Sequence, residues 1–139
     1  MKLRFQTLLA LLLALGSAGP GRAAGPAPHN PRRDSVEAAL RRLPRPDSLR
    51  LFTLNEVIWE NRDSNPARAL ALAAEALALG QRLHSARGLA KTYVLRGIIY
   101  SMSGRLAESI IDFEACRRLR TQLRDWEGVA GAINNVGEV

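Results

Sequence analysis

The two side chains best spaced for chemistry are Glu56 and Glu60, which lie one helical turn apart. Paired carboxylates can act together as a general acid and a general base. Neither glutamate has a partner histidine, and Arg62 and Arg68 are near enough in the sequence to neutralise both carboxylates. We therefore expect these residues to form ion pairs rather than a catalytic pair.

The remaining reactive side chains are isolated from one another. His29 lies in a flexible leader, and His84 closes a predicted helix, where a partly charged imidazole suits the helix dipole. No set of His, Cys, Asp and Glu residues has the spacing of metal ligands, and no glycine-rich phosphate loop follows a strand. The sequence therefore predicts a protein that is not an enzyme and that holds no metal or cofactor.

Cys116 is the only cysteine, so no disulfide can form within the chain. It occupies a small-residue position on the inner face of its predicted helix, where a thiol behaves as a small apolar group. We expect a core residue; the alternative is a reactive or intermolecular thiol.

A repeat organises the second half of the chain. The segment 88–90 returns at 128–130, and Gly97 returns at Gly137, in both cases 40 positions later. Such a period indicates stacked units that each contact only their neighbours. Stacked units usually present a binding surface rather than a catalytic pocket.

Each unit is predicted to contain two amphipathic helices. In the second unit, Ser85 is an N-cap, Gly104 ends the first helix, and the second helix starts at Leu106. The short loop requires the two helices to run antiparallel. Gly97 lies in the middle of the first helix, where close approach of Phe113 or Ile110 would offset its low helix propensity.

The first and third units repeat this pattern with different end signals. The first helix of the first unit is marked by Leu51, Leu54, Val57 and Ile58. Asn65-Pro66 forms an N-cap followed by proline at the first helical position, and an alanine-rich helix runs from Ala67 to Leu83. Asp125 is the N-cap of the third unit, whose first helix reaches Val139.

Large, small and aromatic residues recur at fixed places in the second unit: Tyr93, Gly97, Tyr100, Gly104, Ser109, Phe113 and Cys116. In these positions the chain resembles the tetratricopeptide repeat (TPR) family. The resemblance covers residues 49–139, as two units and the start of a third. It implies an all-α fold, a right-handed superhelical stack of antiparallel helix hairpins (a TPR-like α-solenoid). This stack would follow a signal peptide and a flexible leader, which the N-terminal residues predict separately.

The chain departs from the family pattern in its long period, in Arg96 where leucine is common, and in a first unit without the paired glycine and tyrosine. The longer variant, with Asn65-Pro66 and the segment 134–137, is similar to repeats in exported sensor regions of bacterial signalling proteins. That resemblance implies a non-catalytic protein–protein interaction or signal-sensing module. It would be the N-terminal part of a longer signalling protein, such as a histidine kinase. The alternative is a stand-alone periplasmic scaffold of an envelope or secretion assembly.

The resemblance also implies a binding surface on the inner helices. Some family members clamp a partner's terminal carboxylate with lysine and asparagine, but only Lys91 and Asn134 suit this here, and they lie in different units. We therefore expect an apolar groove for a helix or a neighbouring subunit; the alternative is that Leu54 and Ile98 pack between units. The predicted partner-binding residues are Leu54, Ile58, Lys91, Val94, Ile98, Ser101 and Asn134.

Residues 1–23 have the pattern of a secretory signal peptide. Two basic residues precede an apolar core from Leu8 to Leu15, and small residues permit cleavage after Ala18 or Ala23. The alternative is an uncleaved membrane anchor, but the apolar run is shorter than the roughly 20 residues that span a bilayer. No cysteine follows the core, which argues against a lipoprotein.

Residues 24–48 form a leader rich in proline and alanine. Within it, residues 34–43 are predicted either as a short helix that caps the first repeat or as a second mobile stretch. Pro44 and Pro46 would end such a helix.

The formal net charge is +7, and nearly all of the positive charge in the predicted mature chain is arginine. Four arginines cluster near the end of one predicted helix: Arg117, Arg118, Arg120 and Arg124. They suit either a phosphate-binding patch or a favourable placement of charge at a helix C-terminus. Because an export signal precedes them, we expect the second and no nucleic-acid partner.

The last predicted helix, residues 125–139, has an apolar face and few charges. The apolar residues are Val129, Ala130, Ile133, Val136 and Val139. We expect that the sequence is a fragment of a longer protein or that another chain covers this face. In the first case a membrane contact would come through a missing downstream segment, and in the second the chain would self-associate through this helix.

Export is directly testable. Fractionation of cells that express the chain should recover a shortened product outside the cytoplasm, because residues 1–23 should direct export and be removed. Mass spectrometry would identify the new N-terminus. An intact chain that starts at Met1 and stays in the cytosol would contradict the prediction.

Overall fold

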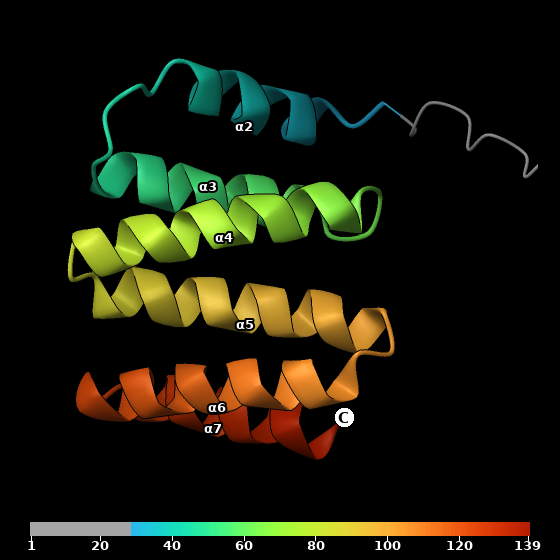
Figure 1. The fold of residues 1–139 in the computed structure, drawn as a ribbon, viewed down its shortest axis with the longest axis vertical. Helices are drawn as coiled ribbons and strands as arrows, with labels where there is room; N and C mark the ends of the chain where they lie inside the picture. The colour runs from blue at the N-terminus through green and yellow to red at the C-terminus, as the bar shows by residue number, and fades with distance from the viewer. Residues whose placement is uncertain (1–28) are drawn as a thin grey trace, which may run out of the picture.

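The structure is a computed structural model, which describes residues 29–139. The predicted signal peptide and the start of the leader lie outside these residues. The described residues form α-helices and no strand (Figure 1). The helices are α2 (Pro31–Arg41), α3 (Ser48–Asn61), α4 (Pro66–Arg82), α5 (Ala86–Met102), α6 (Leu106–Gln122) and α7 (Trp126–Gly137). The all-α expectation is therefore confirmed for this part of the chain.

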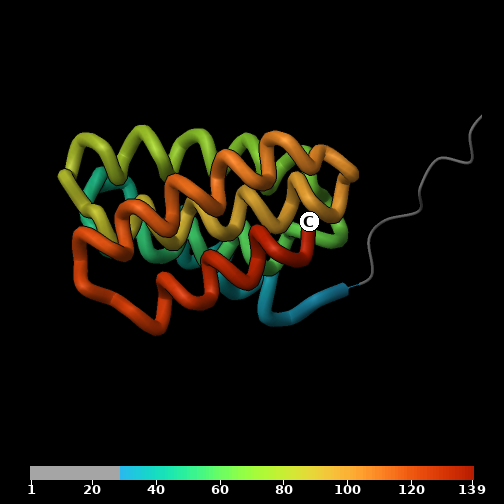
Figure 2. Tube along the Cα trace, turned by 90° about the horizontal axis from the view of Figure 1, so that it is seen from below, coloured from blue at the N-terminus to red at the C-terminus, as the bar shows by residue number. Residues whose placement is uncertain are grey.

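The helices form a stack in which each one packs against the next in sequence. Helix α2 lies at one end and α7 at the other (Figure 1). Helices α4 and α6 lie on one side of the stack and α3, α5 and α7 on the other, as the view along the stack shows (Figure 2). Helix α3 also contacts α5 directly. None of the described helices is both long enough and apolar enough to cross a membrane.

The predicted N-caps begin their helices as expected. The side chains of Asn65, Ser85 and Asp125 each accept a hydrogen bond from the backbone N–H three residues later, at 3.1, 3.2 and 3.0 Å. These bonds satisfy N–H groups that have no partner within the first turn. Helix α6 differs, because Arg105 precedes it and gives no side-chain cap.

Three helices end in the same way. Gly104, after α5, has a φ of 72°, in the left-handed region that glycine adopts at little cost. His84 and Arg124, 40 positions apart, take the same conformation after α4 and α6, with φ of 50° and 55°. The repeat in the turns therefore persists where the sequence has no glycine.

Helix α2 begins earlier than the helix that we predicted over residues 34–43. Asn30 is its N-cap, accepting hydrogen bonds from the backbone N–H groups of Arg32 and Arg33 at 3.0 and 3.2 Å, and Pro31 is its first residue. This is the same Asn-Pro signal that starts α4. Leu40 is buried and packs in one cluster with α3 residues, so α2 covers the end of the stack.

The interior consists of two clusters. The larger one joins α2, α3, α4 and α5, and the smaller one joins Ala90 of α5, Cys116 of α6 and Ala132 of α7. The larger cluster contains Leu40, Leu51, Leu54, Val57, Ile58, Ala69, Ala73, Ala76, Leu79, Leu95 and Ile99. The C-terminal end of the stack therefore has a much thinner core than the N-terminal end.

The contact between α5 and α6 is centred on Gly97. A Cβ atom there would lie 2.6 Å from Cε1 of the buried Phe113 ring, which is closer than packed atoms approach. Ser109 Oγ donates a hydrogen bond of 2.9 Å to the Gly97 carbonyl. Of the two predicted partners of Gly97, Phe113 is therefore confirmed, whereas Ile110 is exposed.

A buried ion pair links the same two helices. Arg96 donates two hydrogen bonds of 2.7 Å from Nε and Nη2 to the carboxylate of Asp112, which is almost fully buried. The hydrogen bonds with Asp112 raise the pKa of Arg96, although burial opposes this. The guanidinium carbon lies 5.6 and 5.7 Å from the ring centres of Tyr93 and Tyr100. This two-pronged pair fixes the register between α5 and α6.

We expect Gly97→Leu to lower the free energy of unfolding by about 2–3 kcal/mol, because the new side chain would overpack against Phe113. Gly97→Ala should also be destabilising.

Gly131→Ala is the matched control, since a Cβ at this position in α7 would meet no atom within 4 Å. It should raise stability by up to about 1 kcal/mol through helix propensity. Denaturant unfolding monitored by circular dichroism would measure both. Equal effects of the two alanine substitutions would contradict this packing.

Candidate partner-binding groove

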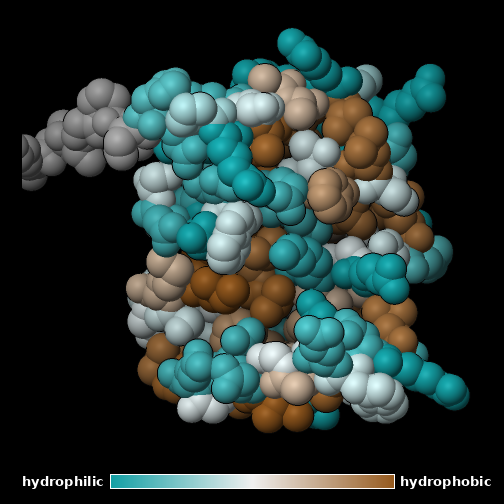
Figure 3. Space-filling view, turned by 180° about the vertical axis from the view of Figure 1, so that it is seen from behind, coloured by the Kyte–Doolittle hydropathy of each residue, from teal (hydrophilic) through white to brown (hydrophobic). Residues whose placement is uncertain are grey.

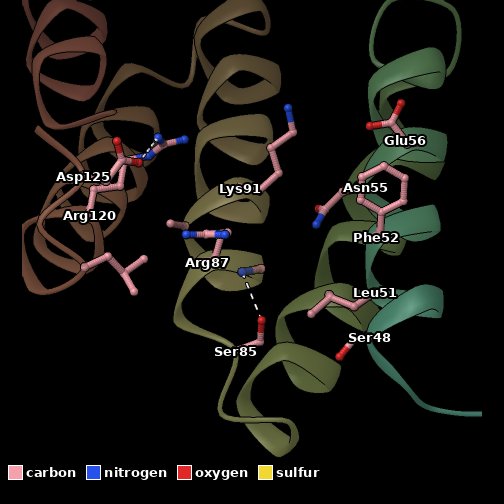
Figure 4. A pocket seen from close by; sticks show the side chains of 13 residues that line it. Ser48, Leu51, Phe52, Asn55, Glu56, Ser85, Arg87, Lys91, Arg120 and Asp125 are labelled. Carbon is pink, nitrogen blue, oxygen red and sulfur yellow. Dashed lines mark hydrogen bonds and ion pairs between the residues drawn. The ribbon is translucent and has the colours of Figure 1, made fainter. Parts of the chain in front are cut away.

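A groove of about 460 Å³ lies between α3 and α5 and reaches the turn between α6 and α7 (Figure 4). We call it the α3–α5 groove. It is lined by Ser48, Leu51, Phe52, Asn55 and Glu56 of α3, by Ser85, Arg87, Gly88, Ala90 and Lys91 at the start of α5, and by Arg120, Leu123 and Asp125.

The α3 wall presents an aromatic ring to solvent. The core face of α3 contains Leu51, Leu54 and Ile58, and Phe52 lies about 100° away from Leu51 around the helix. Phe52 is therefore 64% exposed. Glu56 lies one turn further along the same side. The wall is anchored to α5 below this surface, since Asn55 accepts a hydrogen bond of 2.8 Å from Thr92.

The α5 wall is cationic. Arg87 and Lys91 lie one turn apart, and both are exposed. Lys91 has no ion-pair partner among the described residues. Figure 4 shows Lys91 on the wall opposite Phe52 and Glu56. The groove therefore combines an exposed ring, a carboxylate and two cations.

An ion pair fixes the end of the groove. Arg120 Nη1 lies 2.7 Å from Asp125 Oδ2, and Asp125 also caps α7 by accepting a hydrogen bond from the Gly128 N–H. The bond from Gly128 and the charge of Arg120 lower the pKa of Asp125. Asp125 is therefore ionised at neutral pH and holds the α6–α7 turn against α6.

Cys116 lies beneath this ion pair and is fully buried. Burial raises the pKa of its thiol, and this outweighs the opposite effect of Arg120, whose Nε lies 3.3 Å from the sulfur. The sulfur is thus a protonated thiol at neutral pH and packs with Ala90 and Ala132. Its surroundings are those of the core residue that we expected.

Two of the seven predicted partner-binding residues are buried, so their prediction is wrong. Leu54 and Ile58 are 0% exposed and belong to the larger buried cluster. Helices α2, α4 and α5 surround this face of α3, so neither side chain is accessible to a partner. For Leu54, the alternative of packing between helices is the correct one.

Four of the other five residues follow one side of α5, at spacings of three, four and three positions, whereas Asn134 lies on α7. Lys91 lines the α3–α5 groove, and Val94 lines an adjoining hollow of about 330 Å³ between α5, α6 and α7. Ile98 and Ser101 line a third hollow, of about 170 Å³. Asn134 is exposed and donates a hydrogen bond of 2.7 Å to Glu138 Oε1.

Phe52, Arg87 and Asp125 line one groove, which was not predicted from the sequence. Phe52 gave a usable signal, because it is a large aromatic residue outside the apolar stripe of its helix. Arg87 gave another, since it precedes Lys91 by one turn. On the face of the molecule opposite to that in Figure 1, apolar patches lie among polar and charged side chains (Figure 3).

The carboxylates of Glu56 and Glu60 are neutralised by a residue that we did not name. Arg32 of α2 lies 2.7 Å from Glu60 and 3.5 Å from Glu56. The predicted partners pair elsewhere: Arg62 with Asp63 at 3.1 Å, and Arg68 with Glu37 at 3.2 Å. The packing of α2 across α3 causes this difference.

Two of the four clustered arginines in and after α6 form ion pairs. Arg117 lies 2.8 Å from Glu114, and Arg120 pairs with Asp125, whereas Arg118 and Arg124 are exposed. Within residues 29–139, no three His, Cys, Asp or Glu side chains are grouped as metal ligands would be.

No protein-family model matches the chain, and neither a curated protein nor a solved structure matches it.

Proposed function

We propose that the chain is a non-catalytic repeat scaffold of the tetratricopeptide type that binds a protein partner in the α3–α5 groove. The observation that carries this proposal is the pairing of an exposed ring, Phe52, with an unpaired cation, Lys91, on opposite walls of one groove. The 40-residue repeat and the contact between Gly97 and Phe113 support the repeat-scaffold part. We also propose that the stack follows a right-handed superhelical course.

The chemistry of the groove favours a peptide segment with an acidic side chain beside an apolar one. Arg87 and Lys91 would pair with the acidic group, and the desolvation of an apolar side chain against Phe52 would supply most of the affinity. Helix α5 has 17 residues, so it is about 25 Å long and offers an elongated wall. An extended or helical segment fits such a wall better than a compact metabolite does.

We also propose that the scaffold works outside the cytoplasm as a signal-sensing or interaction module, in the N-terminal part of a signalling protein such as a histidine kinase. The basic start and leucine core of residues 1–23 support export. Sequencing of the intact gene tests the second part. A membrane helix and a kinase domain in the same reading frame would support it, and a stop codon directly after Val139 would favour the stand-alone periplasmic scaffold.

We expect peptides selected from a random display library on the purified chain to share an acidic residue next to an aromatic or aliphatic residue. Phe52→Ala and Lys91→Glu should each weaken the selected peptides at least about tenfold in a titration, because each removes one wall of the site. Both residues are exposed, so circular dichroism should show unchanged folding.

Ile111→Ala is the matched control. Ile111 is 64% exposed on α6 and does not line the groove, so its substitution should leave the affinity unchanged. Selected peptides that bind the Phe52 and Lys91 variants as tightly as the original chain would show that the partner site lies elsewhere.

A further inference from the structure

Three connections between helices lie along one edge of the stack. They follow α2, α4 and α6, and Figure 1 shows them together on its left side. Four arginines lie at this edge: Arg42 and Arg45 after α2, Arg82 at the end of α4, and Arg124 after α6. All four are exposed, and none forms an ion pair with another described residue. We call these four residues the basic edge.

The arginines at the opposite edge of the stack are paired with carboxylates. In the turns after α3 and α5, Arg62 lies 3.1 Å from Asp63 and Arg105 lies 2.9 Å from Glu108. Arg68, in the first turn of α4, lies 3.2 Å from a carboxylate of α2. The unpaired arginines are therefore concentrated on one side of the stack.

Helix dipoles do not account for the basic edge. A dipole stabilises a cation in the last turn of any helix, so the effect would apply at both edges of the stack. Helices α2, α4 and α6, which end at the basic edge, each have a basic residue in the last turn, whereas α3, α5 and α7 have none there. Arg45 lies outside the helices, between Pro44 and Pro46, which restrict its backbone. The charges thus follow the edge rather than the helix ends.

The acidic residues at this edge do not cancel its positive charge. Asp47 and Asp125 are the N-caps of α3 and α7, and Asp125 also lies 2.7 Å from Arg120. Glu127 is exposed and offsets one of the four arginines. In Figure 3, where this edge is on the right, hydrophilic side chains project from it.

Exposed apolar side chains accompany the arginines. Trp126, the first residue of α7, is 64% exposed, and Leu49, in the first turn of α3, is 57% exposed. Tryptophan rings favour the headgroup level of a membrane, and basic side chains pair with anionic headgroups there. The edge therefore presents both kinds of side chain that the boundary of a bilayer favours.

We propose that the basic edge binds the surface of an anionic phospholipid bilayer, so that the stack stands on this edge. The four arginines pair with lipid phosphates, and Trp126 enters the headgroup layer. Three connections in one row suit a flat sheet of phosphates, beneath which a bilayer has an apolar layer. Duplex nucleic acid also offers phosphates, but its bases are stacked inside and leave no apolar layer for Trp126 and Leu49.

The contact is peripheral and reversible. Each arginine close to an anionic bilayer strengthens binding about fivefold, and salt screens the attraction. The contact differs from one through a downstream segment, because it uses described residues. It is also independent of the α3–α5 groove, so its failure would leave the proposed partner site standing, and the failure of that site would leave this contact standing.

Co-sedimentation with vesicles tests the role of the arginines. The purified chain should bind vesicles of phosphatidylglycerol and phosphatidylcholine more tightly than vesicles of phosphatidylcholine alone, and added salt should weaken the binding. A triple variant with Arg42→Gln, Arg82→Gln and Arg124→Gln should bind the anionic vesicles at least about tenfold more weakly. Circular dichroism should show unchanged folding, because all three side chains are exposed.

The matched control removes three arginines from the opposite edge, by Arg62→Gln, Arg68→Gln and Arg105→Gln. It lowers the net charge by the same amount, but its affinity for anionic vesicles should stay within about twofold of the original, since these residues do not face the bilayer. Residues 1–23 are identical in all variants, so the differences in affinity report on the two edges.

Tryptophan fluorescence tests the orientation. Trp59→Phe leaves Trp126 as the only tryptophan of the chain. Its emission should move to shorter wavelength with anionic vesicles and be quenched by brominated lipids, because the ring enters the headgroup layer. In a Trp126→Phe chain, the emission of Trp59 should not change, since Trp59 lies in the last turn of α3, toward the opposite edge.

Equal loss of vesicle binding in the two triple variants would overturn the proposal, because net charge alone would then govern the attraction. Binding that does not depend on phosphatidylglycerol, or emission of Trp126 that stays unchanged on anionic vesicles, would overturn it as well. A chain that binds a DNA duplex more tightly than anionic vesicles at the same salt would assign the basic edge to nucleic acid instead.

Discussion

The contact of Phe113 with the backbone of Gly97 is the constraint on which the rest of the stack depends. With no side chain at Gly97, α6 comes close enough to α5 for Ser109 to donate a hydrogen bond to the Gly97 carbonyl. The ion pair between Arg96 and Asp112 then fixes the register of the two helices. Since burial makes an unpaired charge costly, an arrangement of α5 and α6 that separated this pair would be disfavoured.

The α3–α5 groove follows from the position of α5. Its side toward α3 forms the cationic wall of the α3–α5 groove, and the ion pair between Arg120 and Asp125 sets the far end of that groove. Helix α6 in turn supports α7 through the small cluster around Cys116. Because each helix buries its apolar face mainly against its neighbours in sequence, α7 depends on α6 for its place in the stack.

The features that could be predicted from the sequence are those that depend on residues close together in it. The caps at Asn65, Ser85 and Asp125 depend on adjacent residues, so the sequence predicts helix starts well. The packing of Phe113 on Gly97 could also be predicted, because both residues occupy repeating positions. The burial of Leu54 could not be predicted in this way, because it depends on helices distant in the sequence that cover α3.

The α3–α5 groove was missed for the same reason. Its residues come from three separate parts of the chain, and their grouping depends on the angle and spacing of the helices rather than on any local pattern. The pairing of Arg32 with Glu60 likewise required α2 to cross α3. A short signal, Asn30-Pro31, marked the start of α2 and could have been recognised by comparison with Asn65-Pro66.

Native-state hydrogen exchange tests most directly whether contacts between neighbouring helices, fixed at the α5–α6 pair, hold the stack together. Amides of α5 and of the α6 residues that pack on it should exchange slowly, and those of α7 should exchange earlier through local opening. Equal protection of α7 and of the α5–α6 pair would contradict this account, because it would indicate one cooperative core that includes every helix.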